Sequence, residues 1–299
     1  MEGVNYMKRV LSIIILATMI MSCTSACGSK FKDGDRTEPT VDYSSSNVMG
    51  DSFTREESSE TSKSGDLFIW EGNKITALTE EGKAETDIVI PDNCEEIGFA
   101  VFTGSAVKNI TFADDDDVEI TMAFNNCKTL ESITLPKNLS KIGMSTFECC
   151  DSLKSISIPE AVSILDKSAF NACSTLEEVT FEGTNIESIG AQCFFSCDSL
   201  KSIEIPEGVE TIGDHAFMRC TSLVNVGLPS TIKSIEKFAF VEVDGIESIS
   251  LKEEVSDLKI DGTAFGMRTS LMDVHVAKGS WCDTNRDSWD VGFKSIIAE

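Results

Sequence analysis

The sequence predicts a solenoid, in which coils of about 23 residues stack on one another and place a parallel β-sheet along one face. Three observations lead to this fold class. Similar segments of 23 to 25 residues follow one another from residue 104 to residue 268. Leucine, phenylalanine and cysteine recur in fixed columns of these segments. Alternating polar and β-branched residues mark one short strand in each segment. Such a period indicates that each coil buries its apolar side against its neighbours, because no coil has a core of its own.

The columns of the repeat assign an inner and an outer side to each coil. Leucine occupies one inner column, phenylalanine occupies another, and cysteine closes most coils. The leucines are Leu130, Leu153, Leu176, Leu200 and Leu223. The phenylalanines are Phe124, Phe147, Phe170, Phe194, Phe217, Phe240 and Phe265, and the cysteines are Cys127, Cys150, Cys173, Cys197 and Cys220. We therefore expect these three columns to form the core.

Each coil is expected to begin with a strand and to return through turns. Residues 155–158 and 202–205 alternate serine or glutamate with isoleucine, which is typical of a half-buried strand. A proline such as Pro159 or Pro206 then ends the strand, because proline lacks the N–H that a ladder needs. The remainder of each coil is predicted to form short turns or 3-10 and helical segments. The solenoid is predicted to span residues 88–276.

Both ends of the solenoid are expected to carry caps, because a terminal coil would otherwise expose its apolar edge. Residues 66–87 read as an N-terminal cap hairpin that covers the first coil. Residues 277–299 read as a C-terminal cap. In the C-terminal cap Trp289, Phe293, Ile296 and Ile297 have the spacing of one helix face.

The N-terminus predicts export. Lys8 and Arg9 precede a mostly apolar segment, residues 10–21, and small polar residues follow it, which is the order of a secretory signal. These twelve residues would reach only about 18 Å as a helix, short of the roughly 30 Å of a bilayer core. A cleaved signal peptide over residues 1–26 is therefore favoured over a permanent span. The following residues, up to 65, are polar and lack an apolar period, which indicates a disordered tether.

The end of the signal segment resembles the lipobox of bacterial lipoproteins, in which small residues precede a cysteine that becomes acylated. Cys27 follows Ser25 and Ala26, whereas the residues before Cys23 fit the pattern less well. The resemblance implies lipid on Cys27, with Cys23 as the alternative and secretion without lipid as the third interpretation. Residues 27–65 would then be the lipidated cysteine and tether. The lipid would be the only contact with the membrane and would hold the chain on the outer face of a bacterial cell.

The coils themselves also resemble a known family. Their consensus is C-x-x-L-x-x-I-x-[IL]-P followed by V-x-x-I-G-x-x-A-F, which resembles the BspA-type (Treponema pallidum-type) leucine-rich repeat of bacterial surface proteins. The resemblance covers residues 88–276 and implies a leucine-rich-repeat solenoid that makes contacts outside the cell. Three departures predict local bulges, namely Glu182 in place of proline, the acidic run 114–117 and two extra residues in coil 244–268.

Composition argues against several classes of function. The chain carries 50 acidic and 25 basic residues, a formal charge of -25, so it would repel nucleic acid. Its two histidines, His215 and His275, leave few partners for a catalytic triad or a histidine-based zinc site. The acidic run 114–117 lacks the ligand spacing of a calcium loop, and no glycine-rich phosphate loop occurs. The sequence therefore predicts no catalytic residue, cofactor or metal site.

The cysteines allow two interpretations. After removal of the signal segment and assignment of Cys27 to lipid, nine remain, and five of these occupy one column. A ladder of buried thiols is favoured, because free cysteine packs as a small apolar residue. Disulfides between coils are the alternative, since strands about 4.8 Å apart place the Cα atoms within bridging range.

The outward positions of the predicted strands form the remaining candidate surface. They are rich in serine and threonine and include no aromatic side chain, lysine or arginine. The candidate binding residues are Thr134, Ser157, Glu178, Thr180, Ser202, Glu204 and Asn225. Glu178, Thr180, Ser202 and Glu204 are the most distinctive group and would suit a cationic or hydroxyl-rich partner. The alternative is a hydroxyl ladder that serves only strand propensity and solubility.

These observations predict a non-catalytic binding protein of the cell surface. It would present a leucine-rich-repeat surface to an extracellular protein or glycan, as an adhesion or interaction module. A structural or scaffolding lipoprotein of the envelope, without a host ligand, is the first alternative. A glycan-active enzyme that uses Glu178 and Glu204 is the least favoured one.

Overall fold

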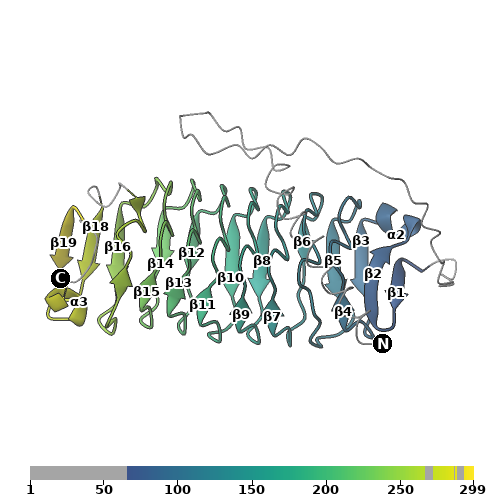
Figure 1. Cartoon of the computed structure of the whole chain (residues 1–299), viewed down its shortest axis with the longest axis horizontal. Coiled ribbons are helices and arrows are strands. Elements are labelled where there is room, and N and C mark those ends of the chain that lie inside the picture. Colours follow the sequence, from purple (N-terminus) through teal and green to yellow (C-terminus); the bar gives the residue numbers. More distant parts are fainter. Residues whose placement is uncertain (1–65, 267–271, 286, 288–292) are drawn as a thin grey trace, which may run out of the picture. The chain divides into compact units, whose positions relative to one another are not determined.

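A computed structural model of the chain describes residues 66–266, 272–285, 287 and 293–299. Within these ranges the protein is a solenoid of stacked coils, which follow one another in a row in Figure 1. The predicted fold class is thereby confirmed. Each coil has three sides, which we call the long-strand side, the short-strand side and the turn side. The predicted signal peptide, the tether and Cys27 lie outside the described residues.

The long-strand side carries the strands that the alternating pattern predicts. Its strands are β3 (Asp87–Ile90), β5 (Asn109–Phe112), β6 (Ser132–Ile133), β8 (Ser155–Ile158), β10 (Glu178–Phe181), β12 (Ser202–Glu204), β14 (Asn225–Gly227), β16 (Ser248–Leu251), β18 (Asp273–Val276) and β19 (Ser295–Ala298). They pair in parallel within four short sheets, β3-β5-β6, β8-β10, β12-β14 and β16-β18-β19. The register places equivalent residues of adjacent coils side by side, as for Ser155 and Glu178.

The short-strand side is a second parallel sheet, which the sequence analysis did not predict. Its six strands are β7 (Lys141–Ile142), β9 (Ile164–Leu165), β11 (Ser188–Ile189), β13 (Thr211–Ile212), β15 (Ser234–Ile235) and β17 (Lys259–Ile260). They pair in that order along the solenoid. Each strand has two residues and is therefore too short to show alternation in the sequence.

The backbone of the turn side contains non-glycine residues in the left-handed conformation. In six successive coils, those of Phe124 to Phe240, two positions have φ between 50° and 65° although neither is glycine. One column is Met122, Ser145, Ser168, Gln192, His215 and Phe238, and the other is Asn126, Cys149, Ala172, Ser196, Arg219 and Glu242. This conformation costs about 1–2 kcal/mol per residue. It directs N–H groups towards the next coil, as when the N–H of Cys149 donates to the carbonyl of Asn171 at 2.8 Å. These bonds between coils offset the cost.

The core is a continuous stack of phenylalanine rings. From Phe102 to Phe265 the ring centroids of adjacent coils lie 5.1 to 5.3 Å apart. Phe102 extends the predicted column by one coil. The leucine and cysteine columns are also buried. Each buried phenylalanine side chain stabilises the fold by about 2–3 kcal/mol through loss of apolar surface to water, so stability is distributed over the coils.

An antiparallel hairpin and a short helix precede the first coils. The hairpin consists of β1 (Phe68–Glu71) and β2 (Lys74–Leu78), and α2 (Glu80–Ala84) follows it. The hydroxyl of Thr79 caps α2 by accepting from the N–H of Gly82 at 3.1 Å. Strand β2 then pairs in parallel with β4 (Glu96–Ile97). Phe68 is buried, which covers the apolar edge of the first coil.

The C-terminal end differs from its prediction. A short helix, α3 (Trp281–Asn285), follows β18, and β19 then adds a further parallel strand beside β18. The prediction that Ile296 and Ile297 lie on a helix face is wrong, because both residues belong to β19. The backbone N–H and C=O groups on the free edge of β18 can pair with a further strand, whereas a helix at this position would leave them unpaired. Isoleucine also favours strands. Trp289, which belongs to the same prediction, lies outside the described residues.

Candidate functional site

All seven predicted binding residues are exposed on the long-strand side. Glu178 and Thr180 lie on β10, and Ser202 and Glu204 lie on β12. The buried Val179 between the first two shows the pleat that turns alternate side chains outward. The other three lie on or next to flanking strands, namely Thr134 after β6, Ser157 on β8 and Asn225 on β14. Since β10 and β12 are in contact, the structure brings the predicted group together.

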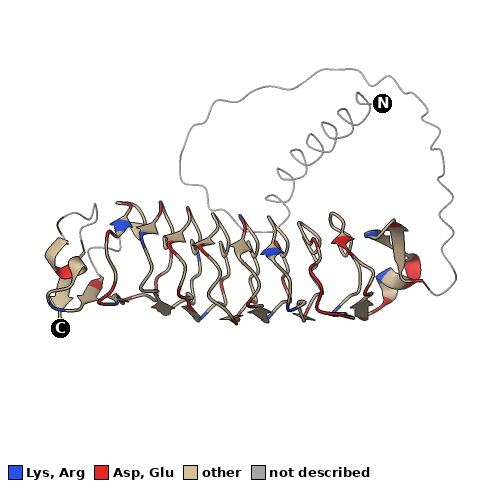
Figure 2. Ribbon diagram, turned by 90° about the horizontal axis from the view of Figure 1, so that it is seen from below, with Lys and Arg blue, Asp and Glu red and all other residues tan. Residues whose placement is uncertain are grey.

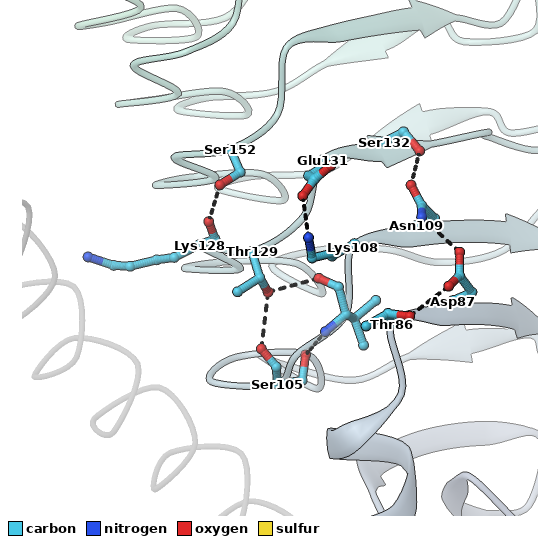
Figure 3. A network of polar contacts seen from close by, with 11 residues as sticks. Thr86, Asp87, Ser105, Lys108, Asn109, Lys128, Thr129, Glu131, Ser132 and Ser152 are labelled. Carbon is cyan, nitrogen blue, oxygen red and sulfur yellow. Dashed lines mark hydrogen bonds and ion pairs between the residues drawn. The ribbon is translucent and has the colours of Figure 1, made fainter.

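At the N-terminal end of the long-strand side, polar side chains of neighbouring coils are hydrogen-bonded to one another, as Figure 3 shows. We call such an end closed. Asp87 accepts from the hydroxyl of Thr86 at 2.7 Å and from the side-chain amide of Asn109 at 2.8 Å. Ser132 in turn donates to the amide oxygen of Asn109 at 2.7 Å. The bonds from Thr86 and Asn109 lower the pKa of Asp87. The polar groups at this end therefore satisfy one another.

The C-terminal end of the same side is closed in a similar way. The hydroxyl of Ser295 donates to Asp273, and the ammonium of Lys294 lies 3.0 Å from the other carboxylate oxygen. These contacts lower the pKa of Asp273, the bond from Ser295 contributing most. The imidazole Nδ1 of His275 lies 2.8 Å from the carboxylate of Glu299. Both ends of the long-strand side thus carry side chains that are paired within the protein.

The middle of this side is different. Among the described residues, the side chains of Glu178, Thr180, Ser202 and Glu204 have no hydrogen-bond or ion-pair partner. Close by, Ser157 donates to the carboxylate of Glu182 at 2.6 Å. Two exposed carboxylates and two hydroxyls are therefore available to a partner. We call these four residues the open patch.

Gly227 shapes one edge of the open patch. It faces Glu204 across the pairing of β12 with β14. A Cβ atom at Gly227 would lie only 1.7 Å from a carboxylate oxygen of Glu204, so the carboxylate occupies the space that a side chain would fill. This role of Gly227 is not predictable from the sequence, because nothing in the repeat indicates which neighbouring side chain leans over a glycine.

A column of alternating charge borders the open patch. It reads Lys108, Glu131, Lys154, Glu177 and Lys201 in successive coils. Lys108 pairs with Glu131 at 2.8 Å, and Lys201 pairs with Glu177 at 2.5 Å. These exposed pairs contribute little to stability. The alternation leaves the five residues with a net charge of only +1, from three lysines and two glutamates. Acidic residues are spread along the described coils, with fewer basic residues between them (Figure 2).

The cysteines are core residues in this structure. All nine cysteines of the described residues are free and buried. The thiol of Cys173 donates to the carbonyl of Phe147, in the preceding coil, at 2.9 Å. Burial raises the pKa of Cys94 and of Cys282 to about 11, and it raises the pKa of the column cysteines as well. The protonated thiols therefore act as packing groups and not as nucleophiles.

The described residues hold no group of three or more His, Cys, Asp or Glu side chains that could bind a metal ion. The acidic run 114–117 is instead bonded to the next coil, where Asp115 pairs with Lys137 at 2.8 Å and Asp117 accepts from the hydroxyl of Ser140 at 2.7 Å. No helix in the described part of the chain has the length and apolar character of a membrane span.

The structure also shows a group of residues that the sequence analysis did not select. Phe195, Met218 and Val241 occupy one outward column of the turn side and are only partly buried. Aligning the coils would have revealed them, because the same column holds polar residues in the upstream coils. The repeat predicts only inward residues for the returning part of each coil, so this outward column is not among the candidate residues.

Comparisons with known proteins agree with this architecture. A family model described as BspA type leucine rich repeat region matches residues 81–188 and 187–280, with six copies. No curated protein matches the chain. A solved leucine-rich repeat protein from Bacteroides ovatus is 27% identical, with a TM-score of 0.59 over 75% of this chain and 55% of that one. This chain therefore spans little more than half of that protein.

A second solved structure supports the fold alone. The leucine rich repeat protein of T. pallidum is 23% identical to this chain, with a TM-score of 0.52. The match covers 62% of this chain and 91% of the T. pallidum chain. The shared feature is the stack of coils, and the likeness carries no information on the open patch.

Proposed function

The chain belongs to the family of BspA-type leucine-rich repeat proteins, and from that premise we propose that it is a non-catalytic binding protein of the bacterial cell surface. Membership of this family is consistent with a surface or interaction module. The proposal adds three specific statements. The chain is exported, Cys27 carries a lipid anchor, and the long-strand side contacts an extracellular protein or glycan.

The observation that supports the proposal is the contrast within the long-strand side. Its two ends are closed by bonds such as those of Asp87 and Asp273, whereas the four residues of the open patch have no partner among the described residues. Repeat solenoids use such continuous faces to bind extended partners. Exposed carboxylates of Glu178 and Glu204 beside hydroxyls suit a partner that carries cations or many hydroxyl groups.

The same geometry argues against the glycan-active enzyme. A glycosidase needs one carboxyl group sheltered from water so that it stays protonated as a general acid. Glu178 and Glu204 are both exposed on an open face of the solenoid. We therefore assign the two carboxylates to recognition and not to acid-base chemistry.

Adhesion of bacteria that display the whole chain tests the proposal. We expect cells with the wild-type chain to adhere to immobilised matrix proteins or mucin, and cells with Glu178→Lys and Glu204→Lys to adhere about tenfold less. Surface labelling must show equal amounts of both chains. A Cys27→Ser chain should be released into the medium, which removes adhesion without altering the open patch.

Two results would contradict the proposal. Failure of the displayed wild-type chain to adhere to any of these surfaces would favour the scaffolding alternative. Equal adhesion of the wild-type chain and the double variant would exclude the open patch as the binding site.

A further inference from the structure

The turn side changes character halfway along the solenoid. In three upstream coils one outward column holds Asn125, Glu148 and Asn171. The side-chain amides of Asn125 and Asn171 donate to the two carboxylate oxygens of Glu148 at 3.2 Å and 2.9 Å. This polar ladder therefore pairs its polar groups with one another, with Asn125 buried and Glu148 and Asn171 partly buried.

In the next three coils the same column holds Phe195, Met218 and Val241, which are all partly exposed. The neighbouring column adds His215 and Phe238, whose ring centroids lie 4.9 Å apart. Phe238 is 37% exposed, which is high for a phenylalanine in a protein with a buried phenylalanine core. We call these five residues the turn-side patch.

The composition of the turn-side patch is that of an interface. Aromatic residues, methionine and arginine are enriched where proteins bind one another, and methionine adapts to partners of different shape. Arg219, the one arginine among the described residues, lies next to Met218 and is 3.3 Å from Glu242. By contrast, the seven candidate residues of the long-strand side include no aromatic ring, methionine or arginine.

Carboxylates flank the turn-side patch on both edges. On one edge Asp198 lies within electrostatic reach of Arg219, whose other neighbour is Glu242. On the other edge Asp214 is 2.7 Å from the imidazole of His215, and the N–H of Asp214 donates to Glu236. The carboxylates around this apolar surface therefore outnumber the cations. A partner that brings apolar side chains together with positive charge would complement both features.

We propose that the turn-side patch is a docking site for a polypeptide segment that places an aliphatic or aromatic side chain next to lysine or arginine. This inference rests on the proposed function as an interaction module and adds a second surface with a partner of defined chemistry. A second copy of the chain fits poorly, because each copy carries a formal charge of -25. An anionic membrane fits poorly as well, because the flanking carboxylates repel it.

The test uses the whole chain and a variant that rebuilds the upstream ladder. The changes Phe195→Asn, Met218→Glu and Val241→Asn copy the residues that already occupy this column three coils earlier, so the variant keeps a pattern that the fold accepts. Phage-displayed random peptides are selected on the immobilised wild-type chain. We expect enriched peptides that combine an apolar residue with adjacent lysine or arginine, and at least tenfold weaker binding of these peptides to the triple variant.

The control is the double variant Glu178→Lys and Glu204→Lys, which changes the open patch alone. Peptides that dock on the turn side should bind this variant as they bind the wild type. Loss of peptide binding in the double variant, equal binding to the triple variant, or enrichment of acidic peptides would each overturn the inference. Vesicles that contain phosphatidylserine should not bind the wild-type chain, and selective loss of vesicle binding in the triple variant would identify a membrane site instead.

The adhesion experiment separates this inference from the proposed function. If peptide docking fails while displayed cells still adhere through the open patch, only the turn-side inference is wrong. If adhesion fails while the peptides bind the wild type and not the triple variant, the turn-side inference stands and the open patch loses its assignment.

Discussion

The upstream and downstream halves of the turn side, residues 122–172 and 192–242, enclose the same interior and present different exteriors. Inside, the phenylalanine rings stack at 5.2 to 5.3 Å in both halves. Outside, the first half carries the polar ladder around Glu148, and the second carries the partly exposed column around Met218. Stacking constrains the inner columns, because every coil must match its neighbours, and leaves the outer columns free. Functional differences within a solenoid are therefore to be sought where an outer column changes.

The largest expected effect concerns the shared interior. Phe170→Ala, in the upstream half, and Phe217→Ala, in the downstream half, should each lower the free energy of unfolding by about 3–5 kcal/mol, because both rings are fully buried between neighbours. Urea unfolding followed by circular dichroism measures both. The two values should agree within about 1 kcal/mol. A much smaller loss in one half would show that its interior is less tightly packed than the other.

A second effect comes from the buried thiols that run through both halves. Burial raises the pKa of Cys94 and Cys282 from 9.0 to about 11, and it raises the pKa of Cys173 and Cys220 as well. The unfolded chain releases these protons first as pH rises. The stabilisation is therefore complete below the unfolded-state pKa and is lost as pH increases towards the folded-state values, at about 1.4 kcal/mol per pH unit for each thiol.

The urea midpoint should accordingly fall steeply once the pH exceeds about 9. Cys173→Ala and Cys220→Ala should each reduce the slope of this decline by the same amount, because each removes one buried thiol. The midpoint at several alkaline pH values measures the slope. A midpoint that does not change with alkaline pH would mean that the cysteines are not protonated thiols in the folded protein.

The smallest expected changes in the free energy of unfolding concern the outer columns, where Glu148 and Met218 occupy equivalent positions in the two halves. Glu148→Ala removes the two hydrogen bonds that the amides of Asn125 and Asn171 donate to its carboxylate, which should cost about 1–2 kcal/mol. Met218→Ala, at the equivalent position downstream, should cost less than about 1 kcal/mol, because Met218 is partly exposed and unlike a core methionine. Urea unfolding again provides the comparison. An equal or larger loss for Met218→Ala would place that side chain in the core and weaken the case for a docking surface.

Much of the candidate site followed from local pattern. The alternation around Val179 and Ile203 was enough to predict that Glu178, Thr180 and Glu204 are exposed, because successive residues of a strand point to opposite faces. The pairing of these side chains was not predictable. Which carboxylate lacks a partner depends on the coils on either side: Asp87 and Asp273 are paired near the two ends, whereas Glu178 and Glu204 have no partner among the described residues.

Other features escaped prediction for identifiable reasons. Ile296 and Ile297 have helix spacing, yet they form β19 because the edge of β18 supplies hydrogen bonds that the spacing does not reveal. The short-strand side has two residues per coil and therefore no readable period. The left-handed backbone at residues such as Cys149 carries no glycine signal, because bonds to the next coil stabilise it.

The sequence by itself determined the repeat, the inner columns and the order of the strands. Apolar residues that recur at a fixed period are buried only when each coil stacks on the next one along the chain. Only the tertiary structure decided which outer side chains are paired, where the open patch lies and how the turn-side patch is assembled. The physical reason is that these features arise between coils, among residues separated by a full repeat, where side-chain reach and backbone direction matter more than local composition.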